Sequence, residues 1–417
     1  MNSSTLMAGS VFAQVLTAVA LWLAARSLDP ARFGSFVGLL GLVTLAAAVA
    51  DFGINAVTIR RLARHPEDAA AFTTTLSAKA LMAVLLGALW IGLSLCSVAS
   101  GILSPENGLV STLLGVYLIA AVLSTTLAVP MRSQQRMTLV AIGGVLEEAV
   151  VLVVTAVLLL GLRLGTEAVA LAFLAGSVAS AVFFAALLDA RLRVVKMPTV
   201  RALVELWHES LNFGLSSLSA QLQRADVALV GLVAGAQSAG IFAIPARLTT
   251  PIGILPTAFS SALYPRVAAD GHSMRAQREA AAVGAMMLAA MVAGMAILFV
   301  TADWAVAFLL GPEYAGAAPV LRVYVVAMVA ASANQPMSAY LQAVHDERFV
   351  ARIVMVAAVF GLVAVGVGAA AGGAMGAAFG FAAQQAVVFL VLFARFVRRR
   401  SMGIEMPNNE DLTSANT

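Results

Sequence analysis

The chain has 417 residues, of which 61% are hydrophobic and only 11% are charged. A soluble domain carries about 25% charged residues, so this composition excludes a soluble enzyme and indicates a protein that lies within a lipid bilayer. The formal net charge of +4 reflects 25 basic and 21 acidic residues, and in a membrane protein it is explained by topology rather than by nucleic acid. The single cysteine excludes a disulfide framework.

The apolar runs are rich in Ala, Leu, Val and Gly, and each is about 20 residues long, the length of a helix that crosses the hydrocarbon layer. Strands of a membrane barrel would instead be alternating segments of about ten residues. The sequence therefore predicts an all-α membrane protein with about twelve transmembrane helices. The expected spans are 6–26, 34–54, 72–98, 108–130, 138–161, 166–189, 210–235, 240–265, 280–302, 315–341, 350–370 and 374–396.

Basic residues are distributed unevenly over the connections between these spans. The even-numbered connections and the C-terminal end hold 18 of them, whereas the odd-numbered connections hold only Arg26, Arg32 and Arg163. Cytoplasmic loops of membrane proteins carry the excess of Lys and Arg. This bias predicts that the even-numbered connections and both termini lie in the cytoplasm.

The longest connection, about residues 190–209, divides the spans into two sets of six. We expect an N-terminal six-helix bundle over 1–200, a C-terminal six-helix bundle over 201–400 and a polar cytoplasmic tail over 401–417. A faint repeat supports two related halves, because Gly34-x-Phe36 and Gly240-x-Phe242 each follow a short outer loop. Two such bundles around a central cavity are the architecture of many transporters.

Eight charged residues lie three or more positions inside the expected spans, and a charge at the centre of a span costs about 2.5–3.5 kcal/mol on insertion scales. Such residues are expected to face a wet cavity or an opposite charge. The basic ones are Lys79, Arg224, Arg247 and Arg322, and the acidic ones are Asp51, Glu147, Glu148 and Asp226.

The seventh span is the most polar one, since Gln221 and Arg224 share one face and Asp226 follows on another. The next span carries Arg247 together with several prolines, which allow kinks in a moving gate. We expect Arg224, Asp226 and Arg247 to line the cavity, with structural ion pairing as the alternative.

For Lys79 and Arg322, contact with a substrate and structural ion pairing are equally expected. Asp51 lies near the end of its span, so it either pairs with the nearby Arg60 or Arg61 or takes part in ion coupling. Glu147 and Glu148 are candidates for binding a coupling ion, but adjacent residues diverge by about 100° on a helix. At most one of them can point straight into a cavity.

The glycines Gly372, Gly376 and Gly380 have the spacing that lets membrane helices approach closely, so we expect them to serve helix packing. The four histidines show no metal-ligand spacing. The sequence predicts no catalytic residues, no metal site and no cofactor.

Several segments together are similar to the polysaccharide and oligosaccharide flippases of the multidrug/oligosaccharidyl-lipid/polysaccharide exporter superfamily. The resemblance covers most of the chain, and it depends on the order and spacing of motifs that are individually loose. These motifs are the hairpin at 25–54 with Asp51-Phe52-Gly53 at its end, RRLAR at 60–64, QQRMTLVAI at 134–142, NFGLSSLSAQLQRADVALVG at 212–231 and LLGPEYAGAAPVLRVY at 309–324.

The resemblance implies a multi-pass protein of the bacterial inner membrane. It would move a polyprenyl-diphosphate-linked glycan from the cytoplasmic to the periplasmic leaflet by alternating access, for O-antigen, capsule or exopolysaccharide assembly. It further implies membrane lipid, a polysaccharide polymerase, export machinery, and a proton or sodium ion as partners. Arg224 and Arg247 would hold the diphosphate, and Asp226 would orient Arg224.

Three alternatives stay open. A drug or cation antiporter of the same superfamily is expected to carry an acid in the first span, and 6–26 has none. The peptidoglycan-precursor flippase is expected to have fourteen spans. A membrane glycan polymerase or ligase is expected to carry a large outer loop, whereas the outer connections here are short.

Overall fold

The computed structural model describes residues 2–65, 68–192, 204–211, 213–214, 225–249, 288–343 and 346–401, and these ranges contain helices and no strand. The first half of the chain forms α1 (Asn2–Ser27), α2 (Pro30–Asp51), α3 (Ile54–Arg64), α4 (Ala69–Ala99), α5 (Pro105–Leu127), α6 (Val129–Ser133), α7 (Met137–Ala156), the π-helical turn Val157–Gly161, α8 (Thr166–Ala186) and the 3₁₀ turn Ala190–Leu192. The second half forms a helix at 204–211, α10 (Asp226–Ala234), a helix at 236–249, a helix at Leu288–Val300, α13 (Ala302–Leu309), the 3₁₀ turn Pro312–Tyr314, α14 (Ala317–Ala343) and α15 (Glu347–Ser401).

Local sequence explains where several helices begin. The Asp29 side chain accepts hydrogen bonds from the first amides of α2, and Pro30 occupies the first helical position. Ser104 and Pro105 repeat this arrangement at α5. Side-chain acceptors satisfy amides that have no partner in the first turn, and proline loses nothing there.

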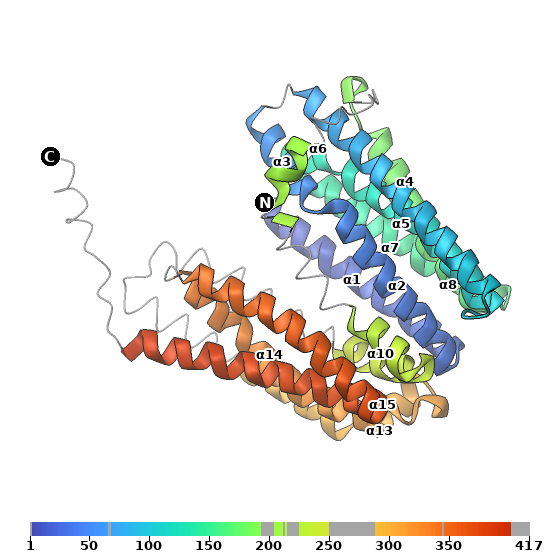
Figure 1. The fold of residues 1–417 in the computed structure, drawn as a ribbon, viewed down its shortest axis with the longest axis vertical. Coiled ribbons are helices and arrows are strands. Elements are labelled where there is room, and N and C mark those ends of the chain that lie inside the picture. Colours follow the sequence, from blue (N-terminus) through green and yellow to red (C-terminus); the bar gives the residue numbers. More distant parts are fainter. Residues whose placement is uncertain are drawn as a thin grey trace.

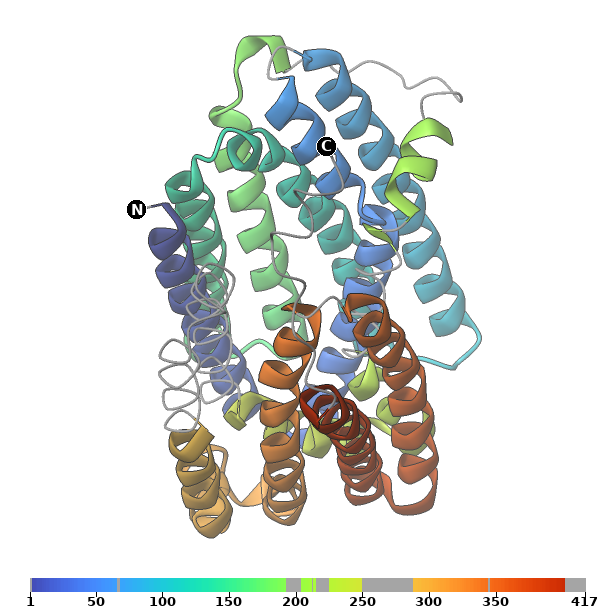
Figure 2. The same ribbon diagram turned by 90° about the vertical axis from the view of Figure 1, so that its left-hand side faces the viewer.

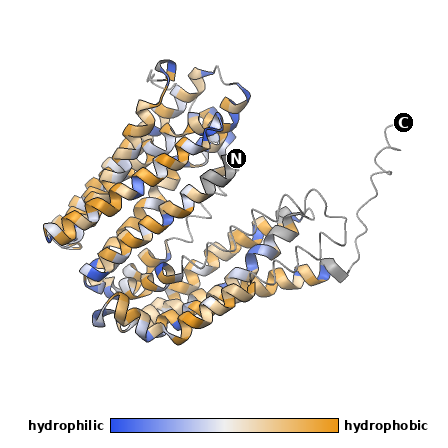
Figure 3. Cartoon of the chain, turned by 180° about the vertical axis from the view of Figure 1, so that it is seen from behind, coloured by the Kyte–Doolittle hydropathy of each residue, from blue (hydrophilic) through white to orange (hydrophobic). Residues whose placement is uncertain are grey.

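Eight of the described helices are long and apolar enough to cross a membrane, and nine are if a bent pair counts as one span. The exposed side chains are apolar where such helices face outward: Leu85, Leu89 and Leu93 are each about 60% exposed and lie along one face of α4. Hydrophobic residues make up most of the helices of both bundles, and many of the hydrophilic ones lie near the helix ends (Figure 3). The chain is an all-α membrane protein, as predicted, and each of the first six expected spans corresponds to a helix.

The last two predicted spans form one continuous element with a sharp internal reversal. Gly373 has φ +60° and Gly372 has φ −150°, so α15 bends there into two antiparallel halves. A β-carbon added to Gly376 would lie 1.9 Å from the carbonyl oxygen of Gly368, and one added to Gly380 would lie 2.2 Å from that of Ala364. Two of the three predicted packing glycines therefore bring the halves together, whereas Gly372 forms the turn.

One break was not predicted from the sequence. The helix Leu288–Val300 meets α13 at an angle of 72°, where we expected a span over 280–302 followed by a loop. Asp303 lies in the first turn of α13 and makes that turn polar. The expected spans 210–235, 240–265 and 280–302 lie partly outside the described residues.

The helices gather into two bundles, one from α1 to α8 and one from α10 to α15, which meet at one end and diverge toward the other (Figures 1 and 2). The beginning of α2, the helix α10 and the helix α13 lie at the end where the bundles meet, here called the closed end. The other end, where α2 finishes at Asp51, is called the open end. The predicted limits near residues 200 and 400 adjoin residues that the structure does not describe, so the exact division stays a prediction.

The two bundles share an internal aromatic arrangement. Three aromatic rings contact one another in series in each, with ring centroids 4.4–6.4 Å apart. The series is Phe36–Phe173–Tyr117 in the N-terminal bundle and Phe242–Tyr324–Phe381 in the C-terminal bundle. Phe36 and Phe242 are the aromatic residues of the repeated Gly-x-Phe motif, so the faint sequence repeat has a counterpart in packing.

Candidate functional site

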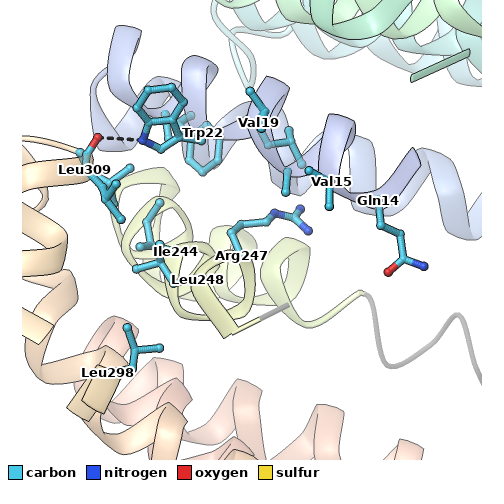
Figure 4. Close-up of a pocket in the computed structure, with 14 residues that line it drawn as sticks. Gln14, Val15, Val19, Trp22, Ile244, Arg247, Leu248, Leu298 and Leu309 are labelled. Atoms are coloured by element: carbon cyan, nitrogen blue, oxygen red, sulfur yellow. Dashed lines mark hydrogen bonds between the residues drawn. The ribbon is translucent and has the colours of Figure 1, made fainter. Parts of the chain in front are cut away.

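A cavity of about 550 Å³ lies between the two bundles, bounded on one side by α1 and on the other by the helix at 236–249 (Figure 4). Its walls are largely apolar. The lining residues are Gln14, Val15, Ala18, Val19, Leu21, Trp22, Ala25, Phe33, Ile244, Arg247, Leu248, Leu298, Leu309 and Leu310.

Arg247 is the charged residue of this lining, and its guanidinium reaches toward α1 (Figure 4). Gln14 supplies a second polar side chain, from α1. The indole nitrogen of Trp22 donates to the carbonyl oxygen of Leu309 at 2.9 Å, which closes the cavity on that side. The cavity therefore combines an apolar wall with one fixed cation, an arrangement suited to a lipid with an anionic head group.

Asp226 and Arg247 come together in the structure, although the sequence had suggested Arg224 as the partner of Asp226, and Asp226 does not line the cavity. Their charges interact with each other, and both interact with the phenol of Tyr324. Asp226 is the first residue of α10, and its carboxylate accepts from the amide of Val227 at 2.7 Å. A carboxylate is favoured at a helix N-terminus because the free amides and the helix dipole are positive there. Gln221 and Arg224 lie outside the described residues, so their roles stay predictions.

Lys79 and Asp51 form an ion pair within the N-terminal bundle. Lys79 has no exposed surface, while the Asp51 side chain is 29% exposed. Asp51 thus pairs with a lysine 28 positions away in the sequence, and not with the nearer Arg60 or Arg61 that we had considered. This geometry fits the structural alternative for both residues.

Arg322 forms an ion pair with Asp303 and donates to the carbonyl oxygen of Phe299 at 3.3 Å. These contacts join α14 to the bent pair of helices, and the Asp303 side chain is 72% exposed. Arg322 does not contribute to the lining of the cavity. Its described contacts are again those of a structural pair.

The two adjacent glutamates of α7 diverge, as helix geometry requires. Glu147 accepts a hydrogen bond from the hydroxyl of Ser177 on α8 at 2.7 Å. Glu148 lies beside Thr17 on α1, and its Oε2 is buried without a hydrogen-bond partner in the described part of the chain. Tyr117 lies close enough to interact with both carboxylates. The N-terminal bundle thus holds a cluster of acidic and hydroxyl groups within helices that are apolar enough to span the membrane.

Sequence reasoning missed Gln14 and Trp22, both on the first span. Gln14 interrupts the apolar run of 6–26, and Trp22 lies one turn before its end, so both carried a signal that we did not use. No group of three His, Cys, Asp or Glu side chains that could hold a metal ion occurs in the described residues.

The fold defines the class of protein. A multidrug resistance transporter of the MATE family and the MOP superfamily, in its inward-facing conformation, superposes with a TM-score of 0.69 at 17% identity, covering 95% of this chain and 96% of that one. The lipid II flippase MurJ, in an inward closed conformation, superposes with a TM-score of 0.75 at 11% identity over 94% and 87% of the two chains. A MOP superfamily transporter from Pyrococcus furiosus gives 0.61 at 19% identity over 96% and 94%. At these identities the likeness establishes the fold of MOP superfamily transporters.

The family follows from sequence. Residues 1–270 match the family model described as polysaccharide biosynthesis protein. The chain belongs to this family, which agrees with the resemblance found above. No curated protein sequence matches the chain.

Proposed function

We propose that this protein is a flippase that moves a polyprenyl-diphosphate-linked oligosaccharide or polysaccharide repeat unit across the bacterial inner membrane. The observation that carries the proposal is the cavity between the bundles, in which Arg247 projects from an apolar wall. Membership of the polysaccharide biosynthesis family supports a glycan as the cargo.

The physical demands of such a substrate match this cavity. The hydroxyl groups of a glycan are costly to strip of water, so the head group needs a polar path between the bundles. The polyprenyl chain stays among apolar side chains and lipid. The diphosphate needs a cation, and the planar guanidinium of arginine offers several hydrogen-bond donors at once. Arg247 would hold the diphosphate, and Asp226 would position Arg247, with Arg224 and Gln221 on the preceding span as additional contacts.

The charge bias of the connections supports outward transport. With both termini in the cytoplasm, the open end faces the cytoplasm and the closed end faces the periplasm. A substrate made on the cytoplasmic side would then enter between the diverging bundles. Alternating access would close the open end and part the closed end.

The membrane potential would assist this movement, because outward transfer of an anion from a negative interior gains about 2.3 kcal/mol per charge per 100 mV. Proton or sodium antiport is a further source of energy. Glu148 is the preferred coupling residue, since it has a buried carboxylate oxygen without a partner in the described residues and adjoins α1, which lines the cavity.

The test is the lipid content of a strain that lacks this gene. We expect a glycan linked to polyprenyl diphosphate to accumulate there, inaccessible to enzymes added from the periplasmic side. The wild-type gene and an Arg322→Gln variant should relieve the accumulation, whereas Arg247→Gln should not. If surface polysaccharide and lipid-linked glycan are normal in a strain without a second flippase, the proposal is wrong.

The fold also occurs in multidrug transporters, and this makes a drug or cation antiporter the second candidate. That function predicts increased sensitivity to cationic drugs in the same strain, with normal lipid-linked glycans. The two readouts separate the candidates in one strain.

A further inference from the structure

We propose that the closed end of the molecule is a gate centred on the direct contact of Gly34 with Gly240, the two glycines of the repeated Gly-x-Phe motif. The proposal rests on the proposed function for its purpose, but not for its test. The gate separates the cavity from the outer side, and it must part in each transport cycle.

The contact is one of bare backbone. A β-carbon on Gly34 would lie 2.0 Å from the carbonyl oxygen of Ala236 and 2.4 Å from the amide nitrogen of Gly240. A β-carbon on Gly240 would lie 1.9 Å from the carbonyl oxygen of Pro30. Because backbone atoms of helix ends cannot swing aside as a flexible side chain does, a single methyl group at either position prevents this approach.

The surroundings of the two glycines form a continuous seal. Gly38 lies one turn further along α2, and a β-carbon added there would lie 3.7 Å from the Cα of Ala228 on α10, an ordinary contact distance. Glycines four residues apart form a flat strip on a membrane helix, and here the strip of α2 lies against the opposite bundle. Phe36 and Phe242 flank the contact, and both are buried in the core.

Hydrogen bonds to backbone carbonyls hold the same end closed. Trp22 and Arg26, near the end of α1, donate to the carbonyl oxygens of Phe308 and Leu309, the last two residues of α13, at 2.9–3.2 Å. The last carbonyls of a helix have no partner within it, and a cation is favoured at this end of the helix dipole. The 72° bend before α13 is what turns these carbonyls toward α1.

A further hydrogen bond joins the connection after α13 to the connection before α2. The hydroxyl of Tyr314 donates to the carbonyl oxygen of Leu28 at 3.2 Å, and its ring meets that of Phe33 edge-on at 6.5 Å. Tyr314 is only 1% exposed. The donors and acceptors of all these bonds lie on opposite bundles, so each bond must break when the bundles part.

The experiment measures distances between spin labels in the purified full-length chain. In a Cys96→Ser background, which removes the only native cysteine, Ile102→Cys and Leu232→Cys report on the closed end and Arg64→Cys and Val397→Cys on the open end. All four positions are exposed. We expect Gly34→Ala and Gly240→Ala each to lengthen the distance at the closed end and to reduce the population of the closed form by more than about ten-fold.

Matched glycines provide the controls. Gly38→Ala has room for the methyl group, and a β-carbon on Gly144 of α7 would meet nothing within 4 Å, so neither Gly38→Ala nor Gly144→Ala should change the distances. Tyr314→Phe keeps the ring and removes one hydrogen bond, which should shift the ratio of the two forms by roughly five-fold. If Gly34→Ala does not yield folded protein, the closed-end distances in Gly240→Ala and Tyr314→Phe test the gate.

Unchanged distances in folded Gly34→Ala, Gly240→Ala and Tyr314→Phe would overturn the gate. An equal shift in Gly38→Ala would also overturn it, because the effect would then come from the helix rather than from the contact. None of these outcomes depends on the cargo. Failure of the gate leaves the flippase proposal standing, and normal lipid-linked glycans in the deletion strain leave the gate standing.

Discussion

The two bundles share the same aromatic packing, but they differ in the charged residues that they contribute to the cavity and to the protein core. The N-terminal bundle consists of long helices, and its unpaired acidic oxygen belongs to Glu148, among the residues that the structure describes. The C-terminal bundle is broken, at the 72° bend before α13 and at Gly373 within α15, and it supplies Arg247. Under the proposed function, this difference would divide a repeated scaffold between two tasks, with the cation for the substrate in one bundle and the acid for ion coupling in the other.

Near the open end, an ion pair within each bundle joins two of its helices. Asp51 pairs with Lys79 in the N-terminal bundle, and Asp346 receives two hydrogen bonds of 2.9 Å from Arg395 in the C-terminal bundle. These pairs join helices within a bundle rather than between bundles. Each bundle can therefore move as a unit while the two separate.

The largest expected effect is that of removing Arg247, the cation proposed to bind the substrate. Arg247→Gln should lower glycan export by more than about ten-fold, because a charge-assisted contact to a phosphate is lost within a low-dielectric site. Arg322→Gln, the matched change at a residue paired with Asp303, should lower it less than about two-fold. Export is measured as surface polysaccharide per cell at equal protein level. Equal losses in both variants would remove the distinction between a cavity cation and a structural one.

The next effect concerns stability. Asp51→Ala leaves Lys79 buried without its carboxylate, and we expect the unfolding free energy to fall by about 3 kcal/mol. Lys79→Met combined with Asp51→Ala should recover much of this loss, since a buried charge no longer remains. The control is Asp303→Ala, at a mostly exposed pair, which should change stability little. Thermal unfolding of purified protein in detergent gives the ranking, and an unaltered Asp51→Ala variant would argue against a structural role.

A smaller effect is expected at the acidic cluster of the N-terminal bundle. Glu148→Gln should abolish any dependence of transport on a proton or sodium gradient, whereas Glu147→Gln should keep it, because Glu147 is already held by Ser177. The measurement compares initial transport rates with and without an imposed gradient in vesicles. If Glu147→Gln alone abolishes the dependence, the roles of the two residues are reversed.

The smallest effect concerns pH, to which the hydrogen bond between Tyr314 and Leu28 is expected to be insensitive. Burial raises the pKa of the Tyr314 hydroxyl above its usual value of about 10. A group whose pKa is raised on folding contributes its stabilisation below the unfolded value and loses it only as the pH passes the folded one. The hydroxyl thus stays protonated, and the bond to Leu28 should persist between about pH 6 and pH 9. A closed-end distance that lengthens over this range would contradict this.

The sequence was sufficient for elements that depend on local pattern. Runs of apolar residues gave the first six spans, and Gly34 and Gly240 marked equivalent places in the two halves. It was insufficient where distant helices decide the outcome. The bend at Thr301 has no proline or glycine at the break, and the partner of Asp51 is a lysine on another helix rather than the nearest arginine. A charge pattern can show that a partner is needed, but packing chooses it.

The candidate site was predicted in part. The need to offset charge in the membrane pointed to Arg247 and Asp226, which the structure brings together. The same reasoning treated Lys79 and Arg322 as equal candidates, because a sequence does not reveal which cations line the cavity and which lie elsewhere. Arg26 carried an overlooked signal, since it is one of only three basic residues in the odd-numbered connections.

The most direct test of the account is transport by the purified protein in lipid vesicles. A polyprenyl-diphosphate-linked glycan is placed in the vesicles, and the fraction that an added glycosidase can reach is followed over time. We predict that wild-type protein and the Arg322→Gln variant move the lipid between leaflets, and that Arg247→Gln leaves it at the rate of protein-free vesicles. If folded wild-type protein moves the lipid-linked glycan no faster than protein-free vesicles do, under every imposed ion gradient, the flippase proposal is contradicted.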